Sequence, residues 1–348
     1  MCSSDLATLF SLGDASKAAL MVNSLSALCS AFTILFLFWT ITHLVRRVYT
    51  RSNPLEARHI PVIIASGVIG ALTYTFSDTF WFSAVEGELY SMSSLMLGLV
   101  FWAMLKWEEE ADDPSSGRWI ILIAYIMGLG LGIHRLNLLV IPVLVLVFYF
   151  RKYELSAKGF FRALLVAVFL LGLMVFILIP GVPKVAGWFE LLFVNVFGLP
   201  YNSGLLVFIA AVIASLVVLI RFSQRKGKVI LNYIVTGLTV IMIGYSSYAM
   251  IVIRSSARPP MNQNNPSDIF ALSYYINMQQ YGTSPKFHGP YYSAPAEDVR
   301  NVVAGYNKVD GRYKPFYRPE YIYNEKFTTV FPRMYSPEDH HRKSYEYW

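Results

Sequence analysis

The chain has 348 residues, of which 55% are hydrophobic and only 15% are charged, and its formal net charge is +7. An ordinary soluble domain carries about 25% charged residues. The composition therefore excludes that class and indicates a polytopic membrane protein that meets membrane lipids. Because the basic residues are spread over several loops, we interpret the positive charge as a topology signal and expect no nucleic-acid partner.

Both ends of the chain suggest truncation. The first residues are not a signal peptide, because they lack its charged start and apolar core. The chain begins almost inside a predicted helix, and it stops at Trp348 without a closing element. We therefore expect an N- and C-terminally truncated fragment. Cys29 lies in an apolar run, and Cys2 lies among the first residues, on which we base nothing. The two cysteines therefore imply no disulfide framework.

Apolar runs predict eight membrane spans, since a helix needs roughly 20 residues to cross the bilayer core. The runs cover about residues 18–45, 60–76, 89–105, 119–134, 136–150, 162–180, 204–220 and 229–253. The expected fold is mainly α, with a transmembrane helical domain over 1–253.

Basic residues gather in alternate loops, which the positive-inside rule places in the cytoplasm. They are Arg46, Arg47, Arg51, Arg58, Lys106, Arg118, Arg151, Lys152, Lys158, Arg162, Arg221, Arg225, Lys226 and Lys228. The loop 77–92, the turn at His134, the segment 180–203 and the tail then share the outer side. The acidic run 108–113 falls on the cytoplasmic side, and we interpret it as a solvated face.

The tail, 254–348, is rich in Tyr, Pro, Asn and charge and has no apolar run of membrane length. We expect it to be the start of an extracytoplasmic α+β domain. Asp310 and Gly311 predict a hairpin turn in it. A helix can begin at Asn265 and Pro266 and end at Gly282, with one face formed by Ile269, Leu272 and Ile276.

The segment 180–203 is aromatic and largely apolar, and it lies between prolines. It predicts a helix in the membrane interface, where Trp and Phe favour the headgroup level. Two roles stay open: plain anchoring, or a contribution to a lipid-facing substrate groove.

The loop 77–92 carries three carboxylates, Asp78, Glu86 and Glu88, and no Lys or Arg. Carboxylates at a membrane boundary cost desolvation energy, so they are a functional-site hypothesis. They can serve as a general base or hold a divalent metal with a partner. If 84–92 is helical, Glu86 stacks with Tyr90 and Glu88 points away. Alternatively, Gly87 breaks the helix and lets both acids face one cavity.

The alternative is that the acids of this loop only keep it soluble, while its aromatic residues, Trp81 among them, pack at the membrane interface. No metal site is assigned from the residues alone, and no cofactor is certain; a divalent metal is left open.

The turn around His134, Arg135 and Asn137 lies between two apolar segments. An Arg on the outer side needs a counter-charge, either from the carboxylates of 77–92 or from a lipid phosphate. Together with Tyr90 and Trp81, these residues are candidates for binding substrate or lipid phosphate. The alternative is a structural ion pair or hydrogen bond that pins the turn.

No phosphate-binding glycine loop, nucleophile elbow or cysteine–histidine metal pattern is present in the sequence. A nucleotide-fuelled pump is therefore disfavoured.

Several motifs together resemble the bacterial glycosyltransferase family 117, multi-spanning proteins long described only as a domain of unknown function. The motifs are SDTFWFSAVEGELYSMS at 77–93, GIHRLNLL at 132–139, FELLFVNVFGLPYNSG at 189–204, PPMNQNNP at 259–266, YG at 281–282 and FPRMY at 331–335. That family is similar to protein O-mannosyltransferases and other enzymes of the GT-C fold.

The resemblance implies a helical membrane domain joined to an extracytoplasmic domain in the bacterial cytoplasmic (inner) membrane. Such enzymes transfer a sugar from a polyprenyl-phosphate carrier to a protein or glycan acceptor on the outer side. A carboxylate deprotonates the acceptor hydroxyl, and basic or metal groups hold the carrier phosphate.

The chain departs from the family pattern in two respects. Relatives usually carry an earlier span and an outer loop with an acidic pair, where GT-C enzymes commonly place the catalytic base, and this sequence lacks it. Arg135 stands where an aliphatic residue is expected beside His134. Enzyme activity is thus an expectation for the parent protein rather than for this fragment.

Two functions of other classes remain as alternatives: a transporter or flippase of lipid-linked saccharides, and a non-catalytic membrane assembly protein. A transporter needs polar residues near the bilayer midplane. Ionisable residues are scarce within the predicted spans, and the polar clusters gather at one face, which favours the enzyme.

Overall fold

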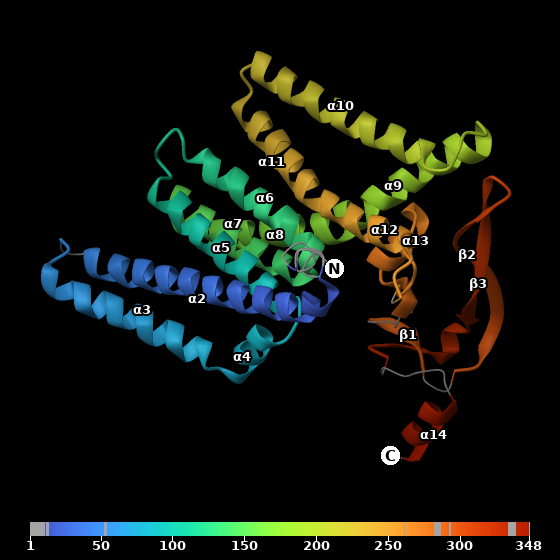
Figure 1. Ribbon diagram of the computed structural model, residues 1–348, viewed down its shortest axis with the longest axis horizontal. Coiled ribbons are helices and arrows are strands. Elements are labelled where there is room, and N and C mark those ends of the chain that lie inside the picture. Colours follow the sequence, from blue (N-terminus) through green and yellow to red (C-terminus); the bar gives the residue numbers. More distant parts are fainter. Residues whose placement is uncertain are drawn as a thin grey trace. The chain divides into compact units, whose positions relative to one another are not determined.

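The computed structural model describes residues 11, 14–51, 54–260, 262–281, 287–291, 294–332 and 339–347. Cys2, Gly282 and the last three residues of the 331–335 motif lie outside them. The chain is mainly helical with a small β part (Figure 1). It divides into two compact units, Met1–Leu178 with Val212–Ile251, and Ile179–Ala211 with Val252–Trp348. The predicted division into a membrane domain, 1–253, and an outer tail, 254–348, stays a prediction.

The first unit consists of helices. Its α-helices are α2 (Ala18–Thr50), α3 (Ile60–Thr75), α4 (Asp78–Val85), α5 (Tyr90–Glu109), α6 (Gly117–Ile133), α7 (Ile141–Lys152), α8 (Ala157–Gly172) and α11 (Val229–Tyr245). Shorter 3₁₀ turns are η1 (Ala15–Lys17), η2 (Ala57–His59), η3 (Arg135–Val140) and η6 (Ser246–Tyr248). Helices α10 (Ser203–Arg225) and α12 (Ala249–Ser256) contribute residues to both units.

Helix α2 packs against both α3 and α5, and α5 packs against α6 (Figure 1). Small residues allow the backbones of α6 and α11 to come into close contact. A Cβ added at Gly244 would lie 2.4 Å from the carbonyl carbon of Gly128. Backbones approach this closely only where side chains are absent, which is the usual packing of helices in membranes.

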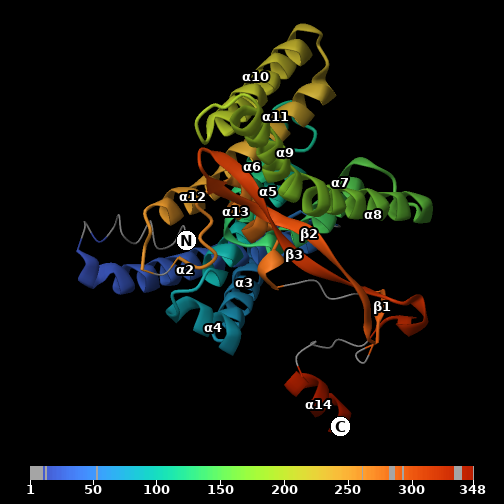
Figure 2. The same cartoon turned by 90° about the vertical axis from the view of Figure 1, so that its right-hand side faces the viewer.

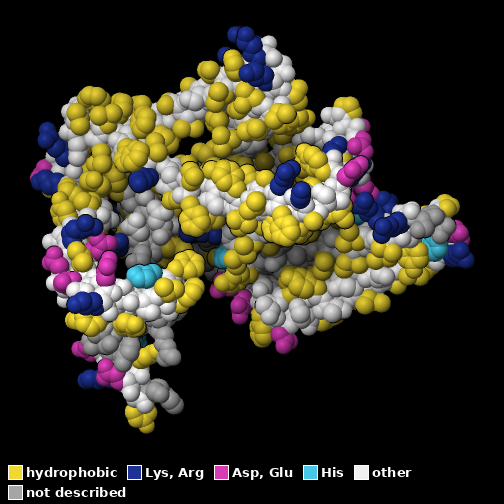
Figure 3. Space-filling view, turned by 180° about the vertical axis from the view of Figure 1, so that it is seen from behind, with side chains coloured by type: hydrophobic (Ala, Val, Ile, Leu, Met, Phe, Trp, Pro, Cys, Tyr) yellow, Lys and Arg dark blue, Asp and Glu magenta, His cyan; other side chains and the backbone are white. Residues whose placement is uncertain are grey.

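The surface of the helices fits a multi-pass membrane protein. In Figure 3, hydrophobic side chains cover much of the face that is shown. On α8, for example, Phe161, Leu165 and Phe169 are exposed and recur every four residues along one side of the helix. Soluble proteins rarely expose continuous apolar surface of this kind.

The predicted count of eight spans is not confirmed. Among the described residues, five helices are long and apolar enough to cross a membrane, or six if the bent pair α4–α5 forms one span. The five are Ala18–Thr50, Ala57–Thr75, Ala157–Val196, Ser203–Arg225 and Val229–Ser256. The predicted fourth and fifth spans became α6, with 17 residues, and α7, with 12, both shorter than the roughly 20 residues a span needs.

The predicted interface helix within 180–203 is not a separate element. Helical backbone runs without a break over Ala157–Val196. It passes through Pro180 and Pro183 directly after a π-helical stretch, η4 (Leu173–Leu178), and a second one, η5 (Leu192–Val196), follows further along. A proline donates no backbone hydrogen bond, so local π geometry lets the helix continue. Its position at a membrane interface stays a prediction.

The second unit contains the β structure. Its elements are α9 (Ile179–Leu191), α13 (Ile269–Ile276), η7 (Gln279–Tyr281), β1 (His288–Pro290), β2 (Ala296–Val309), β3 (Arg312–Tyr323), η8 (Glu325–Phe327), β4 (Thr328–Val330) and α14 (Asp339–Tyr347). Strands β2 and β3 pair antiparallel, as do β1 and β4. Figure 2 shows β2 and β3 as a long twisted hairpin.

Two predictions for the tail are confirmed. Asp310 (φ 50°) and Gly311 (φ 77°) form the turn between β2 and β3, as the preference of Asp-Gly for positive φ indicates. Ile269, Leu272 and Ile276 are buried on one face of α13. The predicted start of this helix is wrong, because Asp268, not Asn265, caps it and accepts hydrogen bonds from the N–H groups of residues 270 and 271.

The hairpin is fastened to the first part of the second unit at Tyr313. The Asn195 amide exchanges two 2.8 Å hydrogen bonds with the backbone of Tyr313. The Tyr313 hydroxyl donates to Glu190, whose side chain is fully buried. Glu190 also accepts the backbone N–H groups of Asn202 (2.6 Å) and Leu205 (3.0 Å), which lie at the start of α10, where anions are favoured.

Candidate functional site

The acidic loop is a sharp bend between two helices. Helix α4 ends at Val85, α5 begins at Tyr90, and their axes differ by 113°. The interpretation of 84–92 as a continuous helix is therefore wrong, and the alternative, a break at Gly87, holds. A Cβ at Gly87 would lie 2.8 Å from Val22 Cγ1 and 3.2 Å from Asn23 Oδ1. Glycine thus lets the bend pack closely on α2.

Two of the three predicted acids lie at this bend, and the third lies at the far end of α4. Asp78 lies in the first turn of α4, Glu86 is the C-terminal cap of α4, and Glu88 follows in the bend itself. All three are exposed. None of their carboxylates makes a salt bridge or hydrogen bond with another described residue. They are accessible groups whose charge no cation of the described residues neutralises.

The predicted turn residues have different environments. Asn137 is buried, donates its amide to the carbonyl of Gly130 (3.0 Å) and accepts the hydroxyl of Ser93 (2.7 Å). Both ends of its side chain are therefore occupied, as the structural alternative for the turn requires. His134 is half-buried, and its Nδ1 accepts the backbone N–H of Leu136 at 3.2 Å, which caps η3.

The start of α5 lies beside this turn. The rings of Tyr90 and His134 are 5.6 Å apart, and the Ser93–Asn137 hydrogen bond lies one helical turn further along. The acidic bend and the turn are thus neighbours. Trp81 points elsewhere and stacks on Phe76, with ring centroids 6.0 Å apart.

Arg135 is half-buried. The expected ion pair with the carboxylates of 77–92 is not formed: within the described ranges, Arg135 has no carboxylate at salt-bridge distance. The second expected partner, a lipid phosphate, stays a prediction.

The segment expected to shape a groove does line a cavity. Pro183, Lys184 and Trp188 of α9 form one wall of a hollow of about 470 Å³, with α13 and β2 opposite. The ammonium of Lys184 lies 5.6 Å from the centre of the Trp188 ring. Polar groups of the same hollow include Ser273, Tyr274, Asn277 and Gln279. Whether a lipid-linked substrate enters it stays a prediction.

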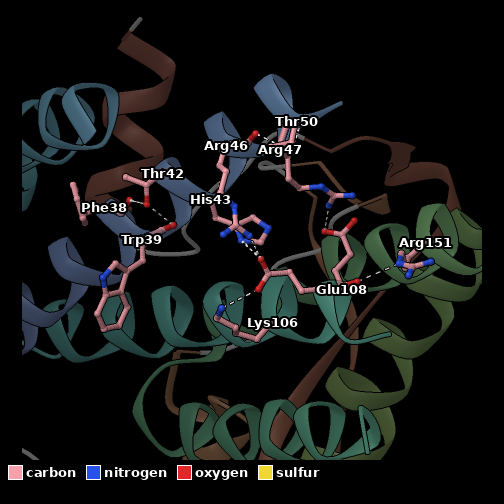
Figure 4. A network of polar contacts seen from close by, with 11 residues as sticks. Phe38, Trp39, Thr42, His43, Arg46, Arg47, Thr50, Lys106, Glu108 and Arg151 are labelled. Carbon is pink, nitrogen blue, oxygen red and sulfur yellow. Dashed lines mark hydrogen bonds and ion pairs between the residues drawn. The ribbon is translucent and has the colours of Figure 1, made fainter. Parts of the chain in front are cut away.

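The acidic run 108–113 is partly exposed, with Asp112 72% exposed. Its members also pair with basic side chains of three other segments, which the interpretation as a solvated face did not include (Figure 4). Glu109 pairs with Arg46 and Lys106, Glu108 with Arg47, Glu110 with Arg118, and Asp112 with Arg151 and Lys152. Hydrogen bonds from Trp119 and Arg118 hold the pKa of Glu110 below its usual range. Arg151 and Lys152 do the same for the pKa of Asp112.

Sequence reasoning missed this cluster because its paired residues lie far apart in the sequence, up to 63 positions for Arg46 and Glu109. The basic residues were informative only as a topology signal. Packing of α5 beside α2 brings the acidic end of one helix next to the basic end of the other. The sequence did contain one signal. The acidic run and the basic residues both lie at ends of predicted helices on the predicted cytoplasmic side.

Two segments match known families. Residues 1–157 match the family model of the Protein O-mannosyl-transferase TMEM260 N-terminal domain. This match supports a mannosyltransferase-like relation. It contains the bend, the turn and the ion-pair cluster, and with them every predicted site residue. Residues 282–348 match a family of unknown function, DUF8416. No curated protein and no solved structure matches the chain.

The described residues contain no group of three or more His, Cys, Asp or Glu side chains placed to hold a metal ion. The family match and the membrane-type helices together suggest a membrane glycosyltransferase.

Proposed function

We propose that this chain is part of an integral membrane glycosyltransferase related to the bacterial glycosyltransferase family 117. In this proposal it transfers a sugar from a polyprenyl-phosphate carrier to a protein or glycan acceptor at the outer face of the bacterial cytoplasmic membrane. The observation that carries the proposal is the exposed, unpaired acid pair Glu86 and Glu88 in a bend that lies inside the mannosyltransferase-type match.

The chemistry is a displacement at the anomeric carbon. Glu86 or Glu88 takes the proton of the acceptor hydroxyl, and the acceptor oxygen forms the new bond to the anomeric carbon. The bond from that carbon to the carrier phosphate breaks, and polyprenyl phosphate leaves with the electron pair. An accessible carboxylate without a protein cation is suited to act as a general base.

The turn beside the bend supplies the phosphate-binding groups in this proposal. Arg135 offers a planar fork of donors that matches a phosphate, and no protein carboxylate among the described residues competes for it. His134, next to Tyr90, adds the N–H of its Nε2 as a second donor, because its Nδ1 accepts the backbone N–H of Leu136. Asn137, whose side chain is already hydrogen-bonded at both ends, and Trp81, which stacks on Phe76, are left out of this proposal. Asp78 remains a third acid that can assist a divalent metal.

The proposed sidedness rests on the loops. Basic residues lie at the ends of α2 and α5 and between α7 and α8, which favours the cytoplasmic side there. The bend at the other end of α5 and the tail 254–348 are then extracytoplasmic.

A transporter of lipid-linked saccharides is the second candidate. The observation that favours it is the 113° break between α4 and α5, because transporters place substrates at discontinuous helices. Transport without sugar transfer by the purified protein would select this candidate.

The test measures sugar transfer from a polyprenyl-phosphate donor in proteoliposomes that contain the parent protein. Removing the general base should lower the rate by about 10²–10⁴-fold, so Glu86→Gln or Glu88→Gln should show this loss. Glu154→Gln is the control, because Glu154 is an exposed acid in the loop after α7. Unchanged transfer in the Glu86→Gln, Glu88→Gln double variant would exclude the bend from the mechanism.

The sidedness has its own test. A single cysteine at Thr79, in a background without Cys2 and Cys29, should react with an impermeant maleimide from the outer side. Labelling only from the cytosol would remove the proposed site from the side where the carrier presents its sugar.

A further inference from the structure

A second polar site lies at the other end of α5 from the bend. A cavity of about 370 Å³ opens between α2, α3 and α5. It is lined by Trp39, Thr42, His43, Arg46, Ile63, Trp102, Leu105, Lys106 and Glu109. Lys106 follows Tyr90 by 16 positions, which is roughly 24 Å along a helix. The cavity is therefore separate from the proposed catalytic bend.

The cavity carries an excess of positive charge. His43, Arg46 and Lys106 point toward one another from α2 and α5 (Figure 4). Arg46 and Lys106 both pair with the single carboxylate of Glu109, so two cations face one anion. Arg46 is 50% exposed and Lys106 38% exposed, which leaves both able to donate to a further acceptor.

Neighbouring ion pairs do not neutralise this excess. Arg47 pairs with Glu108, and Arg151 and Lys152 pair with Asp112. The hydroxyl of Thr42 donates to backbone carbonyls of its own helix. Within the cavity, therefore, no other described side chain offers an anion.

His43 indicates that the cluster is not closed. Its Nδ1 lies 3.3 Å from Glu109 Oε1 and its side chain is 10% exposed. Its Nε2 is buried without a hydrogen-bond partner among the described residues. Because Nδ1 donates to Glu109, Nε2 is an acceptor in the neutral ring. Buried polar atoms are normally satisfied, so this unpaired acceptor indicates remaining capacity for a donor such as a headgroup hydroxyl.

The walls of the cavity are aromatic. The rings of Trp39 and Trp102 are 5.9 Å apart, and Phe36 lies 5.4 Å from Trp39. Indole rings favour the headgroup level of a membrane. Trp39 lies on α2, which is apolar enough to span one, and Trp102 lies on α5, which meets that criterion together with α4. The cavity thus combines a cationic rim with an aromatic wall.

We propose that this cavity binds the phosphate headgroup of an anionic membrane phospholipid. Arg46 and Lys106 donate to the phosphate oxygens, and the indoles of Trp39 and Trp102 pack against the glycerol region. Basic pockets between membrane helices on the cytoplasmic side are suited to anionic headgroups, and guanidinium groups match phosphate oxygens. A free phosphate would share the charge recognition but would leave the aromatic wall unused.

The test uses the purified protein in nanodiscs of phosphatidylcholine doped with phosphatidylglycerol, with bound lipid counted by native mass spectrometry. The Arg46→Gln, Lys106→Gln double variant should retain phosphatidylglycerol roughly tenfold less. The Arg151→Gln, Lys152→Gln double variant removes the same charge outside the cavity and should change retention less than twofold. Equal losses in both double variants would overturn the site.

A second variant, which should raise lipid retention instead of lowering it, tests the site even if the double variant does not fold. Glu109→Gln keeps both cations and removes their shared anion, so retention of phosphatidylglycerol should rise several-fold. Unchanged or lower retention in Glu109→Gln would overturn the proposal. Inorganic phosphate should compete only weakly; if it binds as tightly as the lipid does, the membrane source is wrong.

Discussion

The hydroxyl of Tyr313 donates a 3.1 Å hydrogen bond to the carboxylate of Glu190, a fully buried acid 123 positions away in the sequence. Burial, together with the negative charge of Glu190, raises the pKa of Tyr313. The phenol therefore keeps its proton and remains a donor. Through this contact the β2–β3 hairpin is held on the residues that start α10.

Tyr313→Phe should lower the stability of the second unit. The change leaves one oxygen of a buried carboxylate with a single donor, which costs about 1–3 kcal/mol. Limited proteolysis of the purified protein should cleave the hairpin faster in the variant. Tyr321→Phe is the control, because Tyr321 lies on the same strand and is exposed; equal cleavage of the two variants would contradict the role of the contact.

Asn137→Ala should loosen the turn after α6. Two buried hydrogen bonds, to Ser93 and to the carbonyl of Gly130, are lost together. Polar contacts between membrane helices contribute about 1 kcal/mol each, so the midpoint of thermal unfolding in detergent should fall. Ser93→Ala removes one of the two bonds and should show a smaller fall. A larger loss in Ser93→Ala than in Asn137→Ala would be inconsistent with this geometry.

Gly87→Ala should disturb the bend between α4 and α5. The added methyl would meet Val22 at 2.8 Å, and such overpacking costs about 1–3 kcal/mol. Gly237→Ala is matched to it, because nothing lies within 4 Å of a Cβ at Gly237 and alanine favours helix. Thermal unfolding should therefore separate the two variants, and a Gly87→Ala protein as stable as Gly237→Ala would show that the bend has room to move.

Asp112 should contribute to acid sensitivity. Arg151 and Lys152 lower its pKa from 3.8 in the folded protein. The stabilisation is thus present above the unfolded-state value and is lost as pH falls through the lower folded value. Unfolding midpoints in detergent should fall below about pH 4, and Asp112→Asn should reduce that dependence while lowering stability at neutral pH. A dependence unaltered by Asp112→Asn would assign it to other carboxylates.

Local patterns were sufficient for the parts of the fold that depend on neighbouring residues. The Asp310-Gly311 turn and the buried face of α13 follow from positive φ and helical periodicity. The break at Gly87 was one of two interpretations, and only the close approach to α2 decides between them. The count of eight spans is not confirmed because apolar runs such as 136–150 contain a 3₁₀ turn and only a short helix.

Contacts between distant segments could not be predicted in this way. Glu190 lies inside the motif 189–204, yet nothing in the motif indicates that Tyr313 is its partner. The ion pairs of residues 108–113 with Arg46 and Arg47 follow only from the packing of α2 beside α5. The candidate acids were found because a carboxylate without nearby cations is visible in the sequence itself.

The order of the two units along the chain limits how the protein can be dissected. Residues 179–211 leave the first unit, and residues 212–251 return to it with α11, which meets α6 through Gly244 and Gly128. Ending the polypeptide after Leu178 would strip α6 of that neighbour and expose a glycine seam to lipid. To produce either unit alone, two separate segments of the chain must be joined, because no single cut in the sequence yields a complete unit.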